Sequence, residues 1–185
     1  VGAVREPAGD LVDIVTPHES EEWSGKGSSV VQVVTDDRPF LIDTVTMAIN
    51  RLGWSVRMIF HAQFQVVRDE ECNLIDIADP GASAAGTREA WMTFEVYSPL
   101  GASAVELESA LDAAIRDGLA AVRVAVTDWP AMVARVEDCV ELLEGTPQPI
   151  SPQRVGRVTS LLRWLADDHF AFLGYREYSV AGDVF

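Results

Sequence analysis

Charged side chains cluster where a short run of β-branched residues gives way to a helical pattern. Asp36, Asp37 and Arg38 follow the run directly, and Asp43 lies in the first turns of the next segment. Helix N–H groups bind carboxylates and an aspartate binds an ammonium group, so the cluster predicts a pocket for a small ligand. Turn formation and helix capping use the same residue types, and this structural alternative stays open. The candidate pocket for an effector comprises Asp36, Asp37, Arg38, Pro39, Phe40, Leu41, Asp43 and Thr44.

No other group of residues has the spacing of a catalytic or metal site. The histidines His18, His61 and His169 each lack a second ligand residue at a suitable spacing. The two cysteines, Cys72 and Cys139, fit no C-x-x-C pattern. The sequence contains no G-x-S-x-G, P-loop or G-x-G-x-x-G motif either. We therefore expect no catalytic residue, no metal ion and no cofactor in this chain.

Two aromatic residues indicate a second candidate surface. Trp91 and Tyr97 fall on the less buried side of an alternating strand pattern. An outward aromatic side chain needs cover, which predicts contact with another subunit or domain. Ordinary packing within the domain is the alternative.

The overall charge limits which partners the chain can bind. Its 185 residues include 14 Lys and Arg against 29 Asp and Glu, a net charge of −15. Nucleic acids and anionic membrane surfaces bind basic proteins, so we expect neither partner. No apolar run approaches the roughly 18 residues of a spanning helix, and a basic-then-apolar secretory start is missing. We expect a cytoplasmic protein.

Hydrophobic patterns predict the elements that position these residues. Residues 29–35 read as a buried strand, and 40–52 as a helix with one apolar face. Two long alternating stretches, 56–67 and 90–97, predict strands with one buried side each. A capping box then starts a second helix over residues 103–117.

The next segment decides the topology. Residues 119–126 fit both a strand and a helix, and Gly118 directly before them favours the strand. The order strand–helix–strand–strand–helix–strand then predicts an α+β fold of the ferredoxin-like type, an antiparallel sheet with two helices on one face. We expect the alternating series that start at Val56 and Ala90 to line the inner face of the sheet.

These patterns divide the chain into four parts. Residues 1–28 form an arm or linker, 29–127 the sheet domain, and 128–167 a helical connector. Residues 168–185 open a second domain that the chain does not complete. The run from His169 to Val180 is rich in aromatic and β-branched residues, which predicts the first strand of that domain.

Two stretches resemble the N-terminal region of the large bacterial NAD-specific glutamate dehydrogenases. One is the turn Asp36-Asp37-Arg38-Pro39-Phe40-Leu41-Ile42-Asp43-Thr44 with the long strand through His61. The other is Leu165-Ala166-Asp167-Asp168-His169-Phe170-Ala171-Phe172-Leu173-Gly174-Tyr175-Arg176-Glu177-Tyr178. The first turn also resembles the Asp-Arg-Pro-Gly-Leu turn of ACT domains, which are small βαββαβ regulatory modules. Phe40 replaces the glycine of that turn and would fill space where ACT domains often admit an amino acid.

The resemblance implies an ACT-like regulatory or oligomerisation domain of an oxidoreductase. That enzyme converts L-glutamate, NAD and water to 2-oxoglutarate, ammonia and NADH, and its NAD site would lie elsewhere in a much longer chain. The implied partners are the rest of its own chain, other subunits of a homo-oligomer, and an amino-acid effector in the candidate pocket. The alternative is a module that packs subunits or domains and binds no small molecule.

Overall fold

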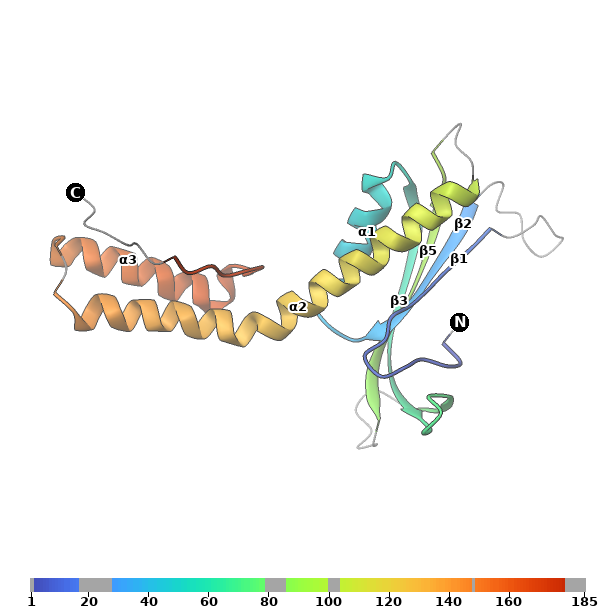
Figure 1. The fold of residues 1–185 in the computed structure, drawn as a ribbon, viewed down its shortest axis with the longest axis horizontal. Helices are drawn as coiled ribbons and strands as arrows, with labels where there is room; N and C mark the ends of the chain where they lie inside the picture. Colours follow the sequence, from blue (N-terminus) through green and yellow to red (C-terminus); the bar gives the residue numbers. More distant parts are fainter. Residues whose placement is uncertain (1, 17–27, 79–85, 100–103, 148, 179–185) are drawn as a thin grey trace. The chain divides into compact units, whose positions relative to one another are not determined.

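The computed structural model describes residues 2–16, 28–78, 86–99, 104–147 and 149–178 (Figure 1). The chain divides into two compact units, Val1–Val122 and Arg123–Phe185. The elements in chain order are β1 (Leu11–Val15), β2 (Ser28–Asp36), α1 (Leu41–Arg51), β3 (Ser55–Arg68), β4 (Leu74–Ala78), β5 (Thr87–Tyr97), α2 (Ala104–Gly145), α3 (Pro152–Trp164) and a π-helical turn (Leu165–His169).

An antiparallel sheet of five strands, in the order β1-β2-β5-β3-β4, is the centre of the first unit. Helix α1 and the first part of α2 lie on one face of this sheet (Figure 1). The α+β class and the layer of two helices are thus confirmed. We call the opposite sheet face the open face. The core between sheet and helices consists of Val31, Val33, Leu41, Val45, Ile49, Trp54, Ala90, Met92, Phe94, Val96, Leu111, Ile115 and Leu119.

The edge strand beside β2 comes from the N-terminal part of the chain. In β1, Val12 is paired with Val33 and Ile14 with Val31, which places the two β1 side chains on the helix-covered face. The expectation of an arm or linker over residues 1–28 therefore misses a strand. β1 takes the position beside β2 where the last strand of a split βαβ fold would pair.

Residues 119–126 belong to α2, so the predicted last strand is wrong. The misleading residue was Gly118, which does not end the helix. A Cβ atom at this position would lie 2.8 Å from the Thr44 methyl carbon on α1, so the glycine permits a close approach of the two helices. Pro130 also lies inside α2. A proline there costs the helix one hydrogen bond, and the flanking turns continue.

One extra residue in β3 changes which of its side chains face the helices. Val56 is paired with Val96, but the next aligned pair is Met58 with Glu95. Such a bulge reverses the alternation, because directly paired residues share a face. The even-numbered series from Met58 to Phe64 consequently lies on the open face, opposite the Ala90 series. The expectation that both series line the inner face is wrong beyond Val56.

The second unit consists of helices and the segment that follows them. Ser151 caps α3 and Pro152 is its first residue. A turn follows, in which Asp168 has a positive φ of 54°. Residues 170–178 then have no regular secondary structure, so the strand predicted from His169 is not formed with any described residue. A strand needs a partner for its backbone N–H and C=O groups.

Candidate functional site

The candidate pocket residues lie at the turn between β2 and α1. The carboxylates of Asp36 and Asp37 both form ion pairs. Asp36 Oδ1 and Oδ2 contact Arg5 Nη2 at 2.5 Å and Arg38 Nη2 at 3.1 Å. Asp37 Oδ2 lies 3.1 Å from Arg88 Nε. An incoming ammonium group must compete with these arginines for either carboxylate.

The first turn of α1 has no side-chain cap. Phe40 occupies the N-cap position with φ 70° and ψ 7°, a left-handed conformation that is unfavourable for a residue with a Cβ atom. Its side chain is 44% exposed, so much of the ring lies outside the core. The first N–H groups of α1 therefore have no side-chain acceptor at the N-cap, and such groups attract carboxylates.

The remaining pocket residues divide between core and surface. Leu41 is buried in the core, whereas Pro39 and Asp43 are exposed. Thr44 directs its methyl group at Gly118 of α2 and helps to set the distance between the helices. The eight residues thus lie together at one turn, but they differ in burial and in the contacts that they make.

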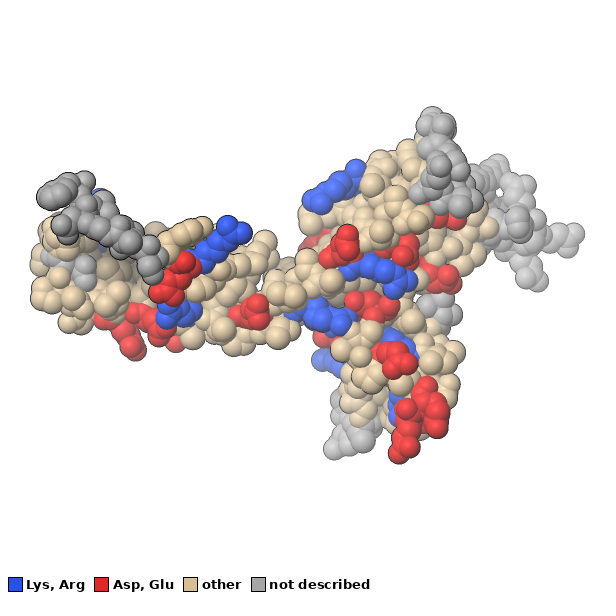
Figure 2. Space-filling view, viewed as in Figure 1, with Lys and Arg blue, Asp and Glu red and all other residues tan. Residues whose placement is uncertain are grey.

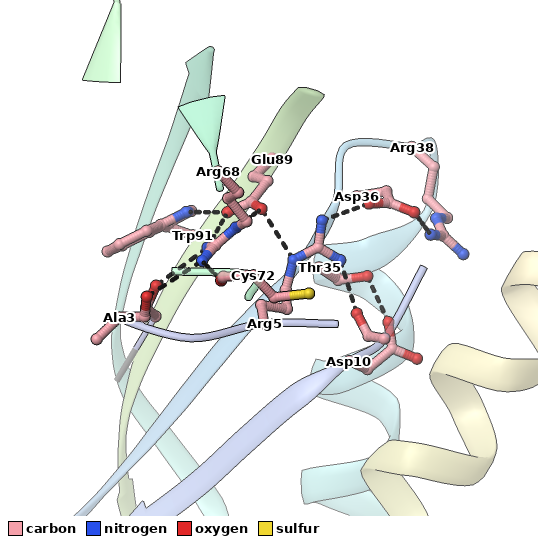
Figure 3. A network of polar contacts seen from close by, with 12 residues as sticks. Ala3, Arg5, Asp10, Thr35, Asp36, Arg38, Arg68, Cys72, Glu89 and Trp91 are labelled. Atoms are coloured by element: carbon pink, nitrogen blue, oxygen red, sulfur yellow. Dashed lines mark hydrogen bonds and ion pairs between the residues drawn. The ribbon is translucent and has the colours of Figure 1, made fainter. Parts of the chain in front are cut away.

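A buried ionic cluster lies beside this turn (Figure 3). Glu89, near the start of β5, is fully buried and accepts hydrogen bonds from three side chains. Arg68 donates from Nε and Nη2 at 2.9 and 3.0 Å, Arg5 donates from Nε at 2.9 Å, and Trp91 donates from Nε1 at 2.9 Å. Arg5 also links Glu89 to Asp36. We call these five residues the Glu89 cluster.

The cluster keeps its buried groups charged. Burial alone raises the pKa of Glu89, but the hydrogen bonds from Arg68, Trp91 and Arg5 outweigh it, and the pKa lies below its ordinary value of 4.5. Burial likewise lowers the pKa of Arg5, whereas hydrogen bonds to Asp36 and Glu89 raise it above its ordinary value. Each charge therefore stabilises its neighbour in the ionised form.

The Glu89 cluster fastens the N-terminal segment to the open face. We call residues 2–9 the N-terminal strap. Arg68 Nη2 donates to the Gly2 carbonyl at 3.0 Å, and the Leu74 N–H donates to the Ala3 carbonyl at 2.7 Å. Gly2 lies so close to the indole of Trp91 that a Cβ atom would stand 2.6 Å from the ring. The strap therefore covers the Trp91 side of the open face.

The two candidate interface residues have different surroundings. Trp91 packs edge-on against Phe64, with ring centroids 5.6 Å apart, and lies beneath the strap. Tyr97 lies beyond the strap and is 37% exposed. On the same face Phe60 is 61% exposed and Met58 is 43% exposed. We call Met58, Phe60 and Tyr97 the bare half of the open face.

A cavity of about 460 Å³ adjoins the cluster. Arg5 and Arg68 line this cavity. Both arginines donate hydrogen bonds to Glu89, to Asp36 or to backbone carbonyls, so a ligand in the cavity would compete with these acceptors. Burial and the neighbouring Glu6 raise the pKa of the Cys72 thiol, which disfavours a reactive thiolate. Among the residues described, no three His, Cys, Asp or Glu side chains are placed to hold a metal ion.

Charge at the surface is mixed (Figure 2). Acidic side chains gather over the turn that joins β3 and β4, where the sequence contains Asp69, Glu70 and Glu71. Several basic side chains in this view lie beside acidic ones. One ion pair joins Arg116 Nε to Asp112 Oδ2 at 2.8 Å. No helix within the described ranges is long and apolar enough to cross a membrane.

Sequence reasoning missed the Glu89 cluster because its members lie far apart along the chain. Arg5 and Glu89 are 84 residues apart, and Arg68 and Glu89 are 21 apart. The local signal is a glutamate between Arg88 and Ala90 at the start of a strand, and this signal does not identify a partner.

An antiparallel sheet with two helices on one face and a strand–helix turn at its edge is the architecture of an ACT-like domain. A model of the family "Glutamate dehydrogenase, ACT1 domain" matches residues 2–111, and the chain belongs to this family.

Three relatives are called NAD-specific glutamate dehydrogenase. The protein from Halomonas elongata is 33% identical over 96% of this chain and 11% of its own length. The proteins from Pseudomonas aeruginosa and Mycobacterium tuberculosis are 34% and 29% identical, each over 90% of this chain and 10% of their own length. The chain thus spans about a tenth of the length of these relatives.

Proposed function

We propose that this chain is a non-catalytic regulatory domain of an NAD-dependent glutamate dehydrogenase, and that it packs against neighbouring domains or subunits through the bare half of its open face. NAD and the chemistry of glutamate oxidation belong, in this proposal, to the remainder of a longer polypeptide. The observation that carries the packing role is the exposure of Met58, Phe60 and Tyr97 on one face of the sheet.

The chemistry of the bare half suits a protein partner. Burying apolar surface contributes about 25 cal/mol per Å², and large aromatic side chains dominate protein interfaces. The charged residues nearest to this surface neutralise each other, because Arg57 Nη1 lies 2.5 Å from Glu95 Oε1. A protein partner can therefore cover this apolar patch without burying an unpaired charge.

The test replaces the apolar side chains in the full-length enzyme. The double substitution Met58→Ser and Phe60→Ser should shift the enzyme toward smaller species in light scattering, or weaken its response to regulators. Because both side chains are exposed, each substitution should change the stability of the domain by no more than about 0.5 kcal/mol. Met47→Ser is the matched control, because Met47 is exposed on α1 and far from the open face in the fold.

An unchanged assembly and an unchanged regulatory response in the double variant would overturn the packing role. If Met47→Ser changes assembly or regulation as much as the double variant does, the effect comes from the loss of surface hydrophobicity in general and not from the bare half of the open face. The family membership of the chain does not depend on either result.

A second candidate function is the binding of an amino-acid effector at the β2–α1 turn. The uncapped first turn of α1 favours it, because free N–H groups at a helix start bind a carboxylate. Asp43 is exposed in the same turn and can receive the ammonium group without displacing an arginine. The ion pairs of Asp36 and Asp37 weigh against a pocket formed by all eight candidate residues.

Calorimetry of the protein against the amino acids separates this candidate from the packing role. Binding of one amino acid that is lost in Asp43→Asn but kept in Asp112→Asn supports an effector site at the turn. Absence of heat with every amino acid, together with a packing defect in the double variant above, leaves the packing role alone.

A further inference from the structure

Strand β1 lies at one end of the sheet, and its sequence suits pairing with a further strand. Four of its five residues are Leu, Val or Ile, and the β-branched types among them favour strands. Among the described strands, only β2 lies beside it. An edge strand presents a row of backbone N–H and C=O groups that can pair with another chain. We call this row, on the side of β1 that faces away from β2, the β1 edge.

The hydrogen bonds of the sheet identify which backbone groups belong to the β1 edge. In an antiparallel sheet, successive residues of a strand point their N–H and C=O groups to opposite sides. The Asp37 N–H donates to the Arg88 carbonyl at 2.9 Å, in continuation of the β2–β5 register, so the even-numbered residues of β2 face β1. Leu11 is paired with Val34 and therefore faces β2. The residues on the β1 edge are consequently Asp10, Val12 and Ile14.

The guanidinium of Arg116, on α2, occupies this edge. Its Nη1 donates to the Asp10 carbonyl at 3.2 Å, and its Nη2 donates to the Val12 carbonyl at 3.1 Å. Its Nε donates to Asp112 Oδ2 at 2.8 Å, one turn earlier on the same helix. One side chain thus fills two successive carbonyl positions of the edge, which the N–H groups of an added strand would otherwise fill.

Contacts at both ends of β1 keep α2 alongside it. Glu108, Asp112 and Arg116 are spaced by four residues and lie on one face of the helix. The hydroxyl of Thr16, directly after β1, donates to Glu108 Oε1 at 2.6 Å. The far end of this helix face contacts the start of β1 through Arg116. The position of the guanidinium on the β1 edge is therefore set by the helix as a whole.

We infer that Arg116 closes the β1 edge to strand addition and thereby prevents a second copy of this chain from pairing with the sheet there. Hydrogen bonds from a guanidinium are charge-assisted and stronger than the neutral bonds of a ladder, so exchanging them for a strand is unfavourable. A second copy is the partner excluded, because each copy presents the same apolar β1 strand. Two such edges can pair antiparallel about a two-fold axis.

Light scattering of the full-length protein over a range of concentrations tests this inference. Arg116→Ala uncovers the two carbonyls, so the average mass of the variant should rise with concentration beyond that of the wild type. The Arg116 side chain is 46% exposed, so its loss should leave the fold intact. The substitution also makes the net charge of −15 more negative, and the added repulsion between copies opposes association.

Asp112→Ala is the matched control. It breaks the same ion pair within α2 but leaves the guanidinium able to donate to the two carbonyls of β1. It also makes the net charge less negative, so association driven by charge alone would appear here first. We expect the mass of this variant to equal that of the wild type at every concentration.

Hydrogen exchange locates the new contact. The amides of Val12 and Ile14 belong to the β1 edge, so an added strand would protect them. In concentrated Arg116→Ala they should exchange roughly tenfold or more slowly than in the wild type. Association of the variant without this protection would place the contact elsewhere and overturn the inference.

Two further results would overturn it. One is an Arg116→Ala variant that is folded by circular dichroism and has the mass of the wild type at every concentration. The other is equal association of Asp112→Ala, in which the edge stays covered. The inference does not use the proposed function, because the β1 edge and the bare half of the open face are different surfaces. Its failure therefore leaves the packing role untouched.

Discussion

Arg5 and Glu89 form an ion pair between the N-terminal strap and the central strand of the sheet, with Nε 2.9 Å from Oε1. Both side chains are almost fully buried, at 3% and 0% exposure. Arg68 shares the same carboxylate oxygen, also at 2.9 Å. One glutamate therefore pairs with two arginines, and its loss removes the negative charge that both share. Arg5 keeps its second carboxylate partner, Asp36.

Glu89→Ala should lower the free energy of unfolding by about 3 kcal/mol, because removing one partner of a buried pair exposes the cost of burying the other. Urea denaturation followed by tryptophan fluorescence measures the change. Glu70→Ala is the control, since Glu70 is exposed in the β3–β4 turn and should cost about 0.5 kcal/mol or less. Equal losses in the two variants would show that the Glu89 cluster does not stabilise the fold.

The stability of the domain should fall in acid through Glu89. Its pKa is lower in the folded than in the unfolded chain, so its contribution is fully present above the unfolded value near 4.5 and is lost as the pH falls through the folded value. The unfolding free energy of the wild type should therefore drop more steeply than that of Glu89→Gln between about pH 6 and about pH 3. Parallel curves for the two proteins would contradict this assignment.

Phe40→Gly should stabilise the domain relative to Phe40→Ala. Both substitutions remove the ring, but only glycine adopts a φ of 70° without a steric penalty. The expected difference is about 1 kcal/mol in favour of glycine, measured by thermal or urea unfolding. An alanine variant as stable as the glycine variant would mean that the left-handed conformation is not retained in solution.

Gly118→Ala should not give the stabilisation of about 1 kcal/mol that replacing a mid-helix glycine usually brings, because the new methyl group meets Thr44. Removing the Thr44 methyl group with Thr44→Ala should restore that gain in the double variant. Gly156→Ala in α3 provides the comparison, since no atom lies within 4 Å of its added Cβ. Additive effects of Thr44→Ala and Gly118→Ala in a double-mutant cycle would exclude the close approach of the helices.

Much of the local structure follows from neighbouring residues. The apolar spacing of α1 leads to the buried positions Leu41, Val45 and Ile49. The helix ends where the sequence predicts, because Gly53 adopts a φ of 78° and its N–H donates to the Asn50 carbonyl. Such signals are readable because the interacting groups lie within one or two turns of each other.

The residues of the strand–helix turn predict its position, but they do not show whether it binds a ligand. Its aspartates, arginine and proline fit both a pocket for a small ligand and the structural alternative of a turn with helix capping. The partners Arg5 and Arg88, which lie far from the turn in sequence, determine that Asp36 and Asp37 are paired. The position of Phe40 was clear, whereas its exposed ring and positive φ became visible only in the folded chain.

The sequence by itself determined the two-helix, antiparallel character of the domain, the ends of α1, and the position of the candidate turn. Only the tertiary structure decided that β1 replaces a strand at residues 119–126, that the bulge after Val56 turns Met58 and Phe60 outward, and that Glu89 joins two distant arginines. The physical reason is the range of the forces involved. Caps and amphipathic periods are local, whereas strand register, the approach of two helices and the pairing of buried charges depend on groups that only folding brings together.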